Sequence, residues 1–293
     1  MVKYSTSPLD ADTPLTVDVA FIGHFARDKI IVGGKETVSS GGSVYYGALA
    51  LRRLGFRVAV ITRLHPDDFP YLDELKQEGI YVFATPADQT SGIENIYTTP
   101  DMDRRICRPL GFAGPFRRED IPDIRTRVFL VGPIIAGEVD IPLVRELARR
   151  GPVALDVQGF VRVREGDALV FRDWPEKEEG LRYVRFLKVD TAEAEFLTGH
   201  EDRRAAARAL AAYGPQEIIL THATGVLVYA DGEYHEAPFT PRALVGRTGR
   251  GDTCFATYVA WRLKAPPEEP SAARPRTVSY THLRAHETRH DLV

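Results

Sequence analysis

Short apolar runs alternate with helix-patterned segments along most of this chain, and this alternation sets the strongest limit on its fold. Strand-like runs lie at 17–22, 57–62, 81–84, 128–131, 153–155, 186–189 and 217–220, and helical patterns at 44–54, 72–77, 143–149, 192–197 and 202–212. Strands that alternate with helices usually pair in parallel, with helices covering both faces of the sheet. We therefore expect an α/β fold with a doubly wound, mostly parallel sheet flanked by helices.

Three segments depart from this alternation and are typical of hairpins. Residues 29–38, 92–112 and 226–236 each carry two short strand-like stretches around a turn. In the last segment the turn is Asp231-Gly232, a dipeptide that favours a two-residue hairpin loop. We expect these hairpins to lie outside the main sheet.

The composition is that of a soluble globular protein, with 44% hydrophobic and 27% charged residues among 293. A net charge of −3 argues against a nucleic-acid surface. Cys107 and Cys254 stand far apart without a CxxC pattern, so a disulfide framework or zinc site is not expected. No apolar run reaches membrane-spanning length, and residues 1–14 are polar without a signal-peptide core. We expect a cytoplasmic protein with no membrane partner.

A glycine-rich segment, Gly246–Asp252, carries the strongest chemical signal because it runs directly into an apolar, helix-patterned stretch. Gly249 and Gly251 allow backbone N–H groups to turn inward, and the helix start adds the positive end of its dipole. This arrangement suits a phosphoryl group, and Asp252 could accept a proton from an attacking hydroxyl. The segment predicts phosphoryl transfer to an alcohol. A tight loop in which Asp252 caps the helix is the alternative.

The chain resembles the ribokinase-like (PfkB) family of carbohydrate kinases over about residues 17–263. Four separated motifs match the family in order, which is more specific than one glycine-rich loop. They are Gly23–Asp28, Gly41–Ala48, Lys188–Glu193 with the following residues to Gly199, and Gly246–Asp252. The resemblance implies a ribokinase-like domain with a small β-sheet lid formed by strands at about 29–38 and 92–112.

On the acceptor side, the resemblance implies that Asp28 binds substrate hydroxyls and that Gly41 and Gly42 form a lid hinge close to the sugar. A carboxylate suits a polyol because it can accept hydrogen bonds from two adjacent hydroxyls. Tyr46 stands where the family usually has a substrate-binding Asn, and this difference weakens the assignment of ribose as the acceptor. Packing on a helix face is the alternative for Tyr46.

On the donor side, Asp190 and Glu193 match a motif that helps to hold Mg²⁺ and phosphate, largely through water. A helix capping box formed by the same two residues is the alternative, and both roles can hold together. Thr221 and Gly225 resemble a nucleotide-contacting turn, and Thr248 belongs to the family's last motif. Arg250 departs from that motif and points either toward the phosphates or to solvent.

The expected function is therefore ATP-dependent phosphorylation of a small sugar, polyol or nucleoside, with Mg²⁺ as cofactor. Asp252 acts as the general base, and backbone N–H groups of Gly249, Arg250 and Gly251 hold the developing charge. A homodimer formed through the lid is also expected from the family. A non-catalytic sugar- or nucleotide-binding member of the same fold is the alternative. A dinucleotide-binding dehydrogenase is disfavoured because Gly23–Asp28 lacks GxGxxG.

The ends of the chain depart from the pattern of a kinase domain. We expect a polar tail at 1–14, a kinase domain at 15–275 that is truncated at its C-terminus, and a non-native tail at 276–293. Residues 277–288 look like translated sequencing-adapter read-through, and no helical period is readable there. A chain of this kind is expected to have an exposed adenine pocket and to be weakly active, insoluble or both.

Overall fold

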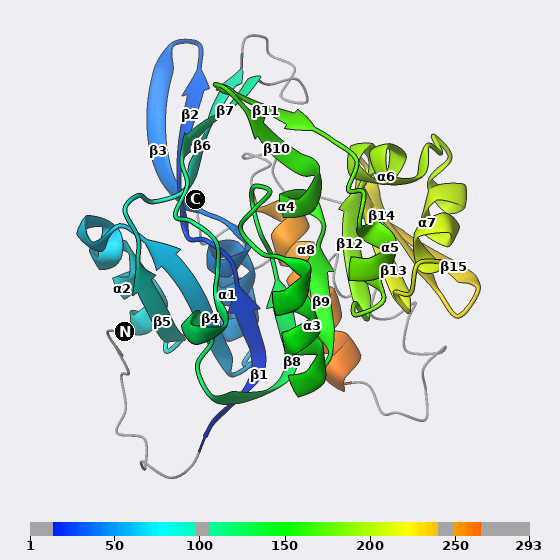
Figure 1. Cartoon of the computed structure of the whole chain (residues 1–293), viewed down its shortest axis with the longest axis horizontal. Coiled ribbons are helices and arrows are strands. Elements are labelled where there is room, and N and C mark those ends of the chain that lie inside the picture. Colours follow the sequence, from blue (N-terminus) through cyan, green and yellow to red (C-terminus); the bar gives the residue numbers. More distant parts are fainter. Residues whose placement is uncertain (1–13, 98–105, 240–248, 265–293) are drawn as a thin grey trace.

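The main sheet has nine strands in the order β15-β14-β13-β12-β9-β8-β1-β4-β5 in the computed structural model, which describes residues 14–97, 106–239 and 249–264 (Figure 1). All neighbours pair in parallel except at β14, which is antiparallel to both β13 and β15. The predicted doubly wound, mostly parallel sheet is therefore confirmed. The strands are β1 Leu15–Ile22, β4 Val58–Leu64, β5 Tyr81–Pro86, β8 Ile124–Val131, β9 Val153–Asp156, β12 Phe186–Asp190, β13 Glu217–His222, β14 Gly225–Ala230 and β15 Glu233–Pro238.

The hairpin of β14 and β15 corrects one expectation, because it extends the main sheet instead of lying outside it. Strand β14 pairs with β13 from Glu217↔Ala230 to His222↔Gly225. Its side chains point alternately to the two faces of the sheet. Val226, Val228 and Ala230 belong to one hydrophobic core, and Leu227 belongs to the other. A strand with apolar residues on both faces is buried within a sheet. The apolar run of β14 was the signal for this placement.

Helices cover both faces of the main sheet, as the alternation predicts. On β1, Val19 and Phe21 belong to one hydrophobic core, and Ala20 and Ile22 belong to the other. The first core also holds α1 Ser43–Arg53, α2 Asp73–Gln77 and α8 Arg250–Lys264, and the second holds α3 Ile141–Arg150, α5 Lys177–Leu181, α6 Thr191–Thr198 and α7 Arg203–Ala211. A 3₁₀ segment, η1 Pro66–Leu72, precedes α2, and another, η2 Arg118–Asp120, precedes β8. None of the helices in this described part is long and apolar enough to cross a membrane.

A separate four-stranded sheet forms the expected lid above one end of the main sheet (Figure 1). Its order is β3-β2-β6-β7, with strands β2 Ala26–Val32, β3 Lys35–Gly41, β6 Gly92–Tyr97 and β7 Ile106–Gly111. Strands β2 and β6 pair in parallel, and the two outer pairs are antiparallel. The turn predicted between β6 and β7 lies outside the described residues.

A second small hairpin, which the sequence pattern did not predict, lies beside the lid. Strands β10 Arg162–Glu165 and β11 Ala168–Phe171 pair in antiparallel fashion after the short helix α4 Gln158–Val161. Strand β11 contacts β7 of the lid (Figure 1). The two-residue turn Gly166-Asp167 was a hairpin signal, but strands of four residues carry too little alternation to be recognised.

Candidate active site

A cavity of about 650 Å³ lies between the lid and the carboxyl ends of the parallel strands. Gly132 follows β8, and Asp156, Asp190 and His222 are the last residues of β9, β12 and β13; all four line the cavity. Ligands of open α/β sheets bind at this edge, because the loops after parallel strands converge there. The lid contributes Asp28, Ile93, Asn95 and Cys107 from the opposite side.

Asp252 lies in this cavity near the start of α8. Helix α8 begins at Arg250, so Asp252 is its third residue and not the residue that caps it. The first N–H groups of a helix have no acceptor within the helix, so this end of α8 can bind an anion. Burial, with the nearby Asp156 carboxylate, raises the pKa of Asp252 to about 6 against the lowering effect of Lys188. The Asp252 carboxyl is therefore mostly ionised at neutral pH.

Lys188 is the central cation of the site, although no role was predicted for it. Its Nζ lies 3.0 Å from Asp156 Oδ2 and 3.6 Å from Glu193 Oε2, and its side chain is 7% exposed. A Cβ at position 251 would lie 3.9 Å from this Nζ, so the ammonium lies beside the start of α8. Burial lowers the pKa of Lys188, but the surrounding carboxylates outweigh it and raise the pKa above its usual range. The ammonium is thus a permanent positive charge beside Asp252.

Asp190 and Glu193 form the capping box that was the alternative to a metal-binding role. Asp190 Oδ1 accepts from the Glu193 N–H at 2.8 Å, and Glu193 Oε2 accepts from the Asp190 N–H at 2.7 Å. The other oxygen, Glu193 Oε1, is buried without a hydrogen-bond partner among the described residues. Burial raises the pKa of Glu193 above its usual range, and the Lys188 ammonium partly offsets this. The capping box and a further ligand at Oε1 are compatible.

These residues fit a magnesium ion that is held through water. No group of three or more His, Cys, Asp or Glu side chains in the described residues could bind a metal directly. The unpaired Glu193 Oε1 is a buried acceptor that a metal-bound water could satisfy. Magnesium keeps several waters in most protein sites, so an outer-sphere carboxylate suits it.

Asp28 and its neighbours form the lid side of the cavity. Asp28 is buried, and its Oδ1 accepts from the Ile93 N–H at 2.9 Å. A Cβ at position 41 would lie 2.5 Å from Asp28 Oδ2, so Gly41 allows the carboxylate to approach the backbone. Asn95 and Cys107 are register partners across β6 and β7, with 3.5 Å between Cys107 Sγ and Asn95 Oδ1. Neither residue was predicted to line the cavity, because that position depends on the pairing of β6 with β7.

Tyr46 lies between the lid and the glycine-rich loop. Its hydroxyl donates to the Ser40 carbonyl on β3 at 3.0 Å. Its ring lies against Gly249, where a Cβ would be 2.4 Å from Tyr46 Cγ, and Gly249 has a φ of 76°. Tyr46 thus lines the cavity and also packs against Gly249, which precedes α8.

The remaining predicted donor-side residues differ in their positions. Thr221 and Arg250 line the cavity, and the Arg250 guanidinium lies 4.5 Å from the centroid of the Phe239 ring. Gly225 begins β14 and packs against the Ala237 carbonyl, away from the cavity lining. Thr248 lies outside the described residues.

Fold and site together define a phosphotransferase of the sugar-kinase type, and the comparison with protein families agrees. The pfkB family carbohydrate kinase model matches residues 19–292. The chain belongs to this family. A cytidine kinase from Thermococcus kodakarensis is 27% identical over 271 residues, which cover 86% of this chain and 91% of that protein.

Solved structures of ribokinase-family members superpose over nearly the whole chain. A pyrophosphate-dependent kinase in complex with sulfate has a TM-score of 0.85 and 35% identity, covering 92% of this chain and 94% of that chain. A pyrophosphate-dependent kinase with a pyrophosphate analogue and myo-inositol has a TM-score of 0.82 and 35% identity, with 92% and 95% covered. The Arabidopsis thaliana ribokinase with ribose and ATP has a TM-score of 0.72 and 16% identity, with 93% and 92% covered, and supports the fold alone.

Proposed function

We propose that the protein transfers the terminal phosphoryl group of a phosphate donor to a hydroxyl of a small polyol. The observation that carries this proposal is the placement of a base and a cation together at the start of α8. Asp252 and the buried Lys188 lie at one end of the cavity, and Asp28 lies on its lid side. This arrangement supplies a proton acceptor, charge stabilisation and a hydroxyl-binding carboxylate, which phosphoryl transfer to an alcohol requires.

In the proposed reaction, Asp252 accepts the proton of the acceptor hydroxyl as its oxygen attacks the terminal phosphorus. The bond from phosphorus to the bridging oxygen breaks, and the shortened donor leaves with that oxygen. The Lys188 ammonium and the N–H groups at the start of α8 stabilise the negative charge on the transferred group. Asp28 orients the acceptor by accepting hydrogen bonds from its hydroxyls. The lid excludes water, which would otherwise compete as an acceptor.

Magnesium, when bound, neutralises charge on the donor phosphates. Glu193 Oε1 and Asp190 would hold it through water, because Glu193 has an unpaired oxygen and Asp190 lines the cavity. The chain's own contribution is to keep both carboxylates in place through the capping box.

For the donor, we propose pyrophosphate, with ATP as the second candidate. Two similar structures at 35% identity are pyrophosphate-dependent kinases, whereas the ribokinase solved with ATP is 16% identical. Arg162 adds a further cation to the cavity lining. An additional cation favours a donor recognised by charge alone, since pyrophosphate offers no base or sugar.

For the acceptor, we propose a cyclic polyol of the inositol class. A similar structure holds myo-inositol. In this cavity the lid residues Asp28, Asn95 and Ile93 are joined by the apolar Ile134 from the loop after β8. Carboxylate and carboxamide groups recognise hydroxyls, and the apolar side chains contact the C–H faces of a ring. A pyrimidine nucleoside is the second candidate, because the Thermococcus kodakarensis relative is a cytidine kinase.

The test uses the full chain with Mg²⁺, each donor and a panel of polyols, sugars and nucleosides, with products identified by phosphorus NMR. We expect turnover with pyrophosphate and an inositol, and a decrease in kcat of roughly 10²- to 10⁴-fold in Asp252→Asn. Turnover with ATP alone would replace the donor, and turnover with cytidine would replace the acceptor. Binding of a donor and a polyol without turnover by any pair would favour a non-catalytic binding protein.

A further inference from the structure

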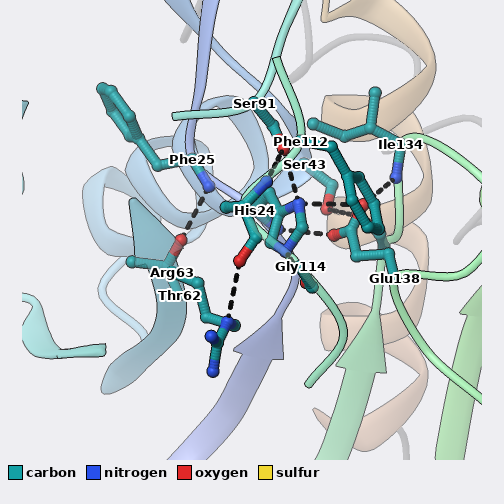
Figure 2. A network of polar contacts seen from close by, with 12 residues as sticks. His24, Phe25, Ser43, Thr62, Arg63, Ser91, Phe112, Gly114, Ile134 and Glu138 are labelled. Atoms are coloured by element: carbon teal, nitrogen blue, oxygen red, sulfur yellow. Dashed lines mark hydrogen bonds and ion pairs between the residues drawn. The ribbon is translucent and has the colours of Figure 1, made fainter. Parts of the chain in front are cut away.

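All four connections between the lid and the main domain meet at one buried residue, His24. His24 lies between β1 and β2, which is the first connection, and is fully buried. Its ring reaches Ser91, just before β6, and Gly114, just after β7 (Figure 2). The fourth connection, from β3 into α1, passes at Gly42, where a Cβ would lie 2.6 Å from the His24 carbonyl oxygen.

The hydrogen bonds of the ring define its tautomer. Nε2 lies 2.9 Å from the Gly114 carbonyl oxygen, which can only accept, so Nε2 carries the proton. Nδ1 then accepts from the Ser91 hydroxyl at 2.7 Å, and Ser91 Oγ accepts from the Ala113 N–H at 3.0 Å. A neutral ring satisfies all of these groups. Burial lowers the pKa of His24 to about 3, so the ring stays neutral.

Glu138 connects His24 to the wall of the cavity. One of its oxygens accepts from the His24 N–H at 2.6 Å, and the other accepts from the Ile134 N–H at 2.8 Å (Figure 2). Its Oε2 also lies 3.4 Å from His24 Nδ1. Ile134 follows β8 and lines the cavity. The carboxylate therefore fixes the start of the lid relative to a loop of the main domain.

We propose that His24, Ser91 and Glu138 are positioning residues that set the hinge of the lid and thereby the place of the acceptor. The groups proposed to bind the acceptor lie a few residues after His24 and Ser91 in the sequence. Asp28 is four residues after His24, and Ile93, whose N–H holds the Asp28 carboxylate, is two residues after Ser91. A shift of His24 and Ser91 moves Asp28 and Ile93 together. Asp252 and Lys188 belong to other elements, α8 and β12, and do not follow this shift. The part of this proposal that concerns the acceptor rests on the proposed function.

The variants Ser91→Ala and Glu138→Gln test the hinge. Ser91→Ala removes the link between the ring and β6, and Glu138→Gln leaves one of two backbone N–H groups without an acceptor. Thr126→Val is the matched control, because its hydroxyl bonds to the Asp18 and Val128 carbonyls on the main sheet, away from the lid. Glu217→Gln is the control for a buried carboxylate elsewhere, since Glu217 pairs with Arg262.

Hydrogen–deuterium exchange of the unliganded chain is the first readout and does not depend on any activity. We expect amides of β2 and β6 to exchange up to about tenfold faster in Ser91→Ala and Glu138→Gln, with β1 and β8 unchanged. The controls should leave the lid at the wild-type rate. Lid exchange at the wild-type rate in Ser91→Ala would overturn the proposal, even if Glu138→Gln failed to fold.

The second readout is the kinetic split, measured with myo-inositol and pyrophosphate as probes. We expect a rise of up to about tenfold in KM for the acceptor, with KM for the donor unchanged. Equal rises in both constants would overturn the placement of these residues on the acceptor side. If no donor and acceptor react, the proposed function fails, while the exchange result still decides whether these residues hold the lid.

Discussion

Removal of the Lys188 ammonium should separate its contribution to folding from its contribution to catalysis. At an effective dielectric constant of 20, a unit charge pair interacts by about 5.5 kcal/mol over the 3.0 Å between Lys188 Nζ and Asp156 Oδ2. Desolvation offsets part of this energy, and loss of one partner of a buried pair typically costs roughly 3–5 kcal/mol. We therefore expect Lys188→Met to lower the free energy of unfolding by roughly 3–5 kcal/mol.

Activity should respond differently from stability when the partner charge is also removed. In the double variant Lys188→Met, Asp156→Asn, the unpaired carboxylate of Asp156 is gone, so a large part of the lost stability should return. The kcat should remain roughly 10²- to 10³-fold below wild type in both variants, because neither has a cation at the start of α8. Urea denaturation and steady-state kinetics on the same preparations measure both quantities. A double variant that recovers kcat along with stability would refute a contact between Lys188 and the transferred group.

Three further predictions concern other groups of the site. The acid limb of the activity profile should lie near pH 6, because only the ionised form of Asp252 can accept a proton; a limb unchanged in Asp252→Glu would argue for another base. Burial raises the pKa of Glu138 from 4.5 to about 7. Between these two pH values the folded chain holds a proton that the unfolded chain has lost. The contribution of Glu138 to the free energy of unfolding should therefore decline as the pH rises from 4.5 to about 7. Urea midpoints between pH 4.5 and 8 should therefore fall less steeply in Glu138→Gln. Gly249→Ala should lose roughly 2 kcal/mol or more through its φ of 76° and its overlap with Tyr46, whereas in Gly251→Ala the nearest atom would lie 3.6 Å from the new Cβ. Equal thermal stability of the two alanine variants would contradict this reasoning.

The features that depend on local pattern could be predicted from the sequence. Apolar runs of strand length identified the parallel strands, and the dipeptide Asp231-Gly232 identified the β14–β15 turn. Asp28, Tyr46 and Asp252 were assigned to the site from motif positions, and all three line the cavity. Their catalytic and binding roles stay predictions, as do a dimer through the lid and a cytoplasmic location.

The features that depend on strand order could not be predicted in the same way. Lys188 and Asp156 are register partners on β12 and β9, but neither strand order nor register is written in the local sequence. A lysine inside the apolar run Phe186–Val189 was the available signal, because a buried cation requires a buried partner. Asp156 ends β9, and its chemistry could not be assigned without knowledge of its neighbour on β12.

Helix α8 has a consequence for the order of events during synthesis. It packs against α1, about 200 residues earlier in the sequence, and a Cβ at Gly47 would lie 3.2 Å from that of Ala256. Phe255 and Tyr258 fill the core on that face. Until α8 has left the ribosome, the nascent chain therefore exposes an apolar surface on α1 to chaperones. The same helix carries Asp252, so the ribosome completes the core and the proposed catalytic base in a single late step.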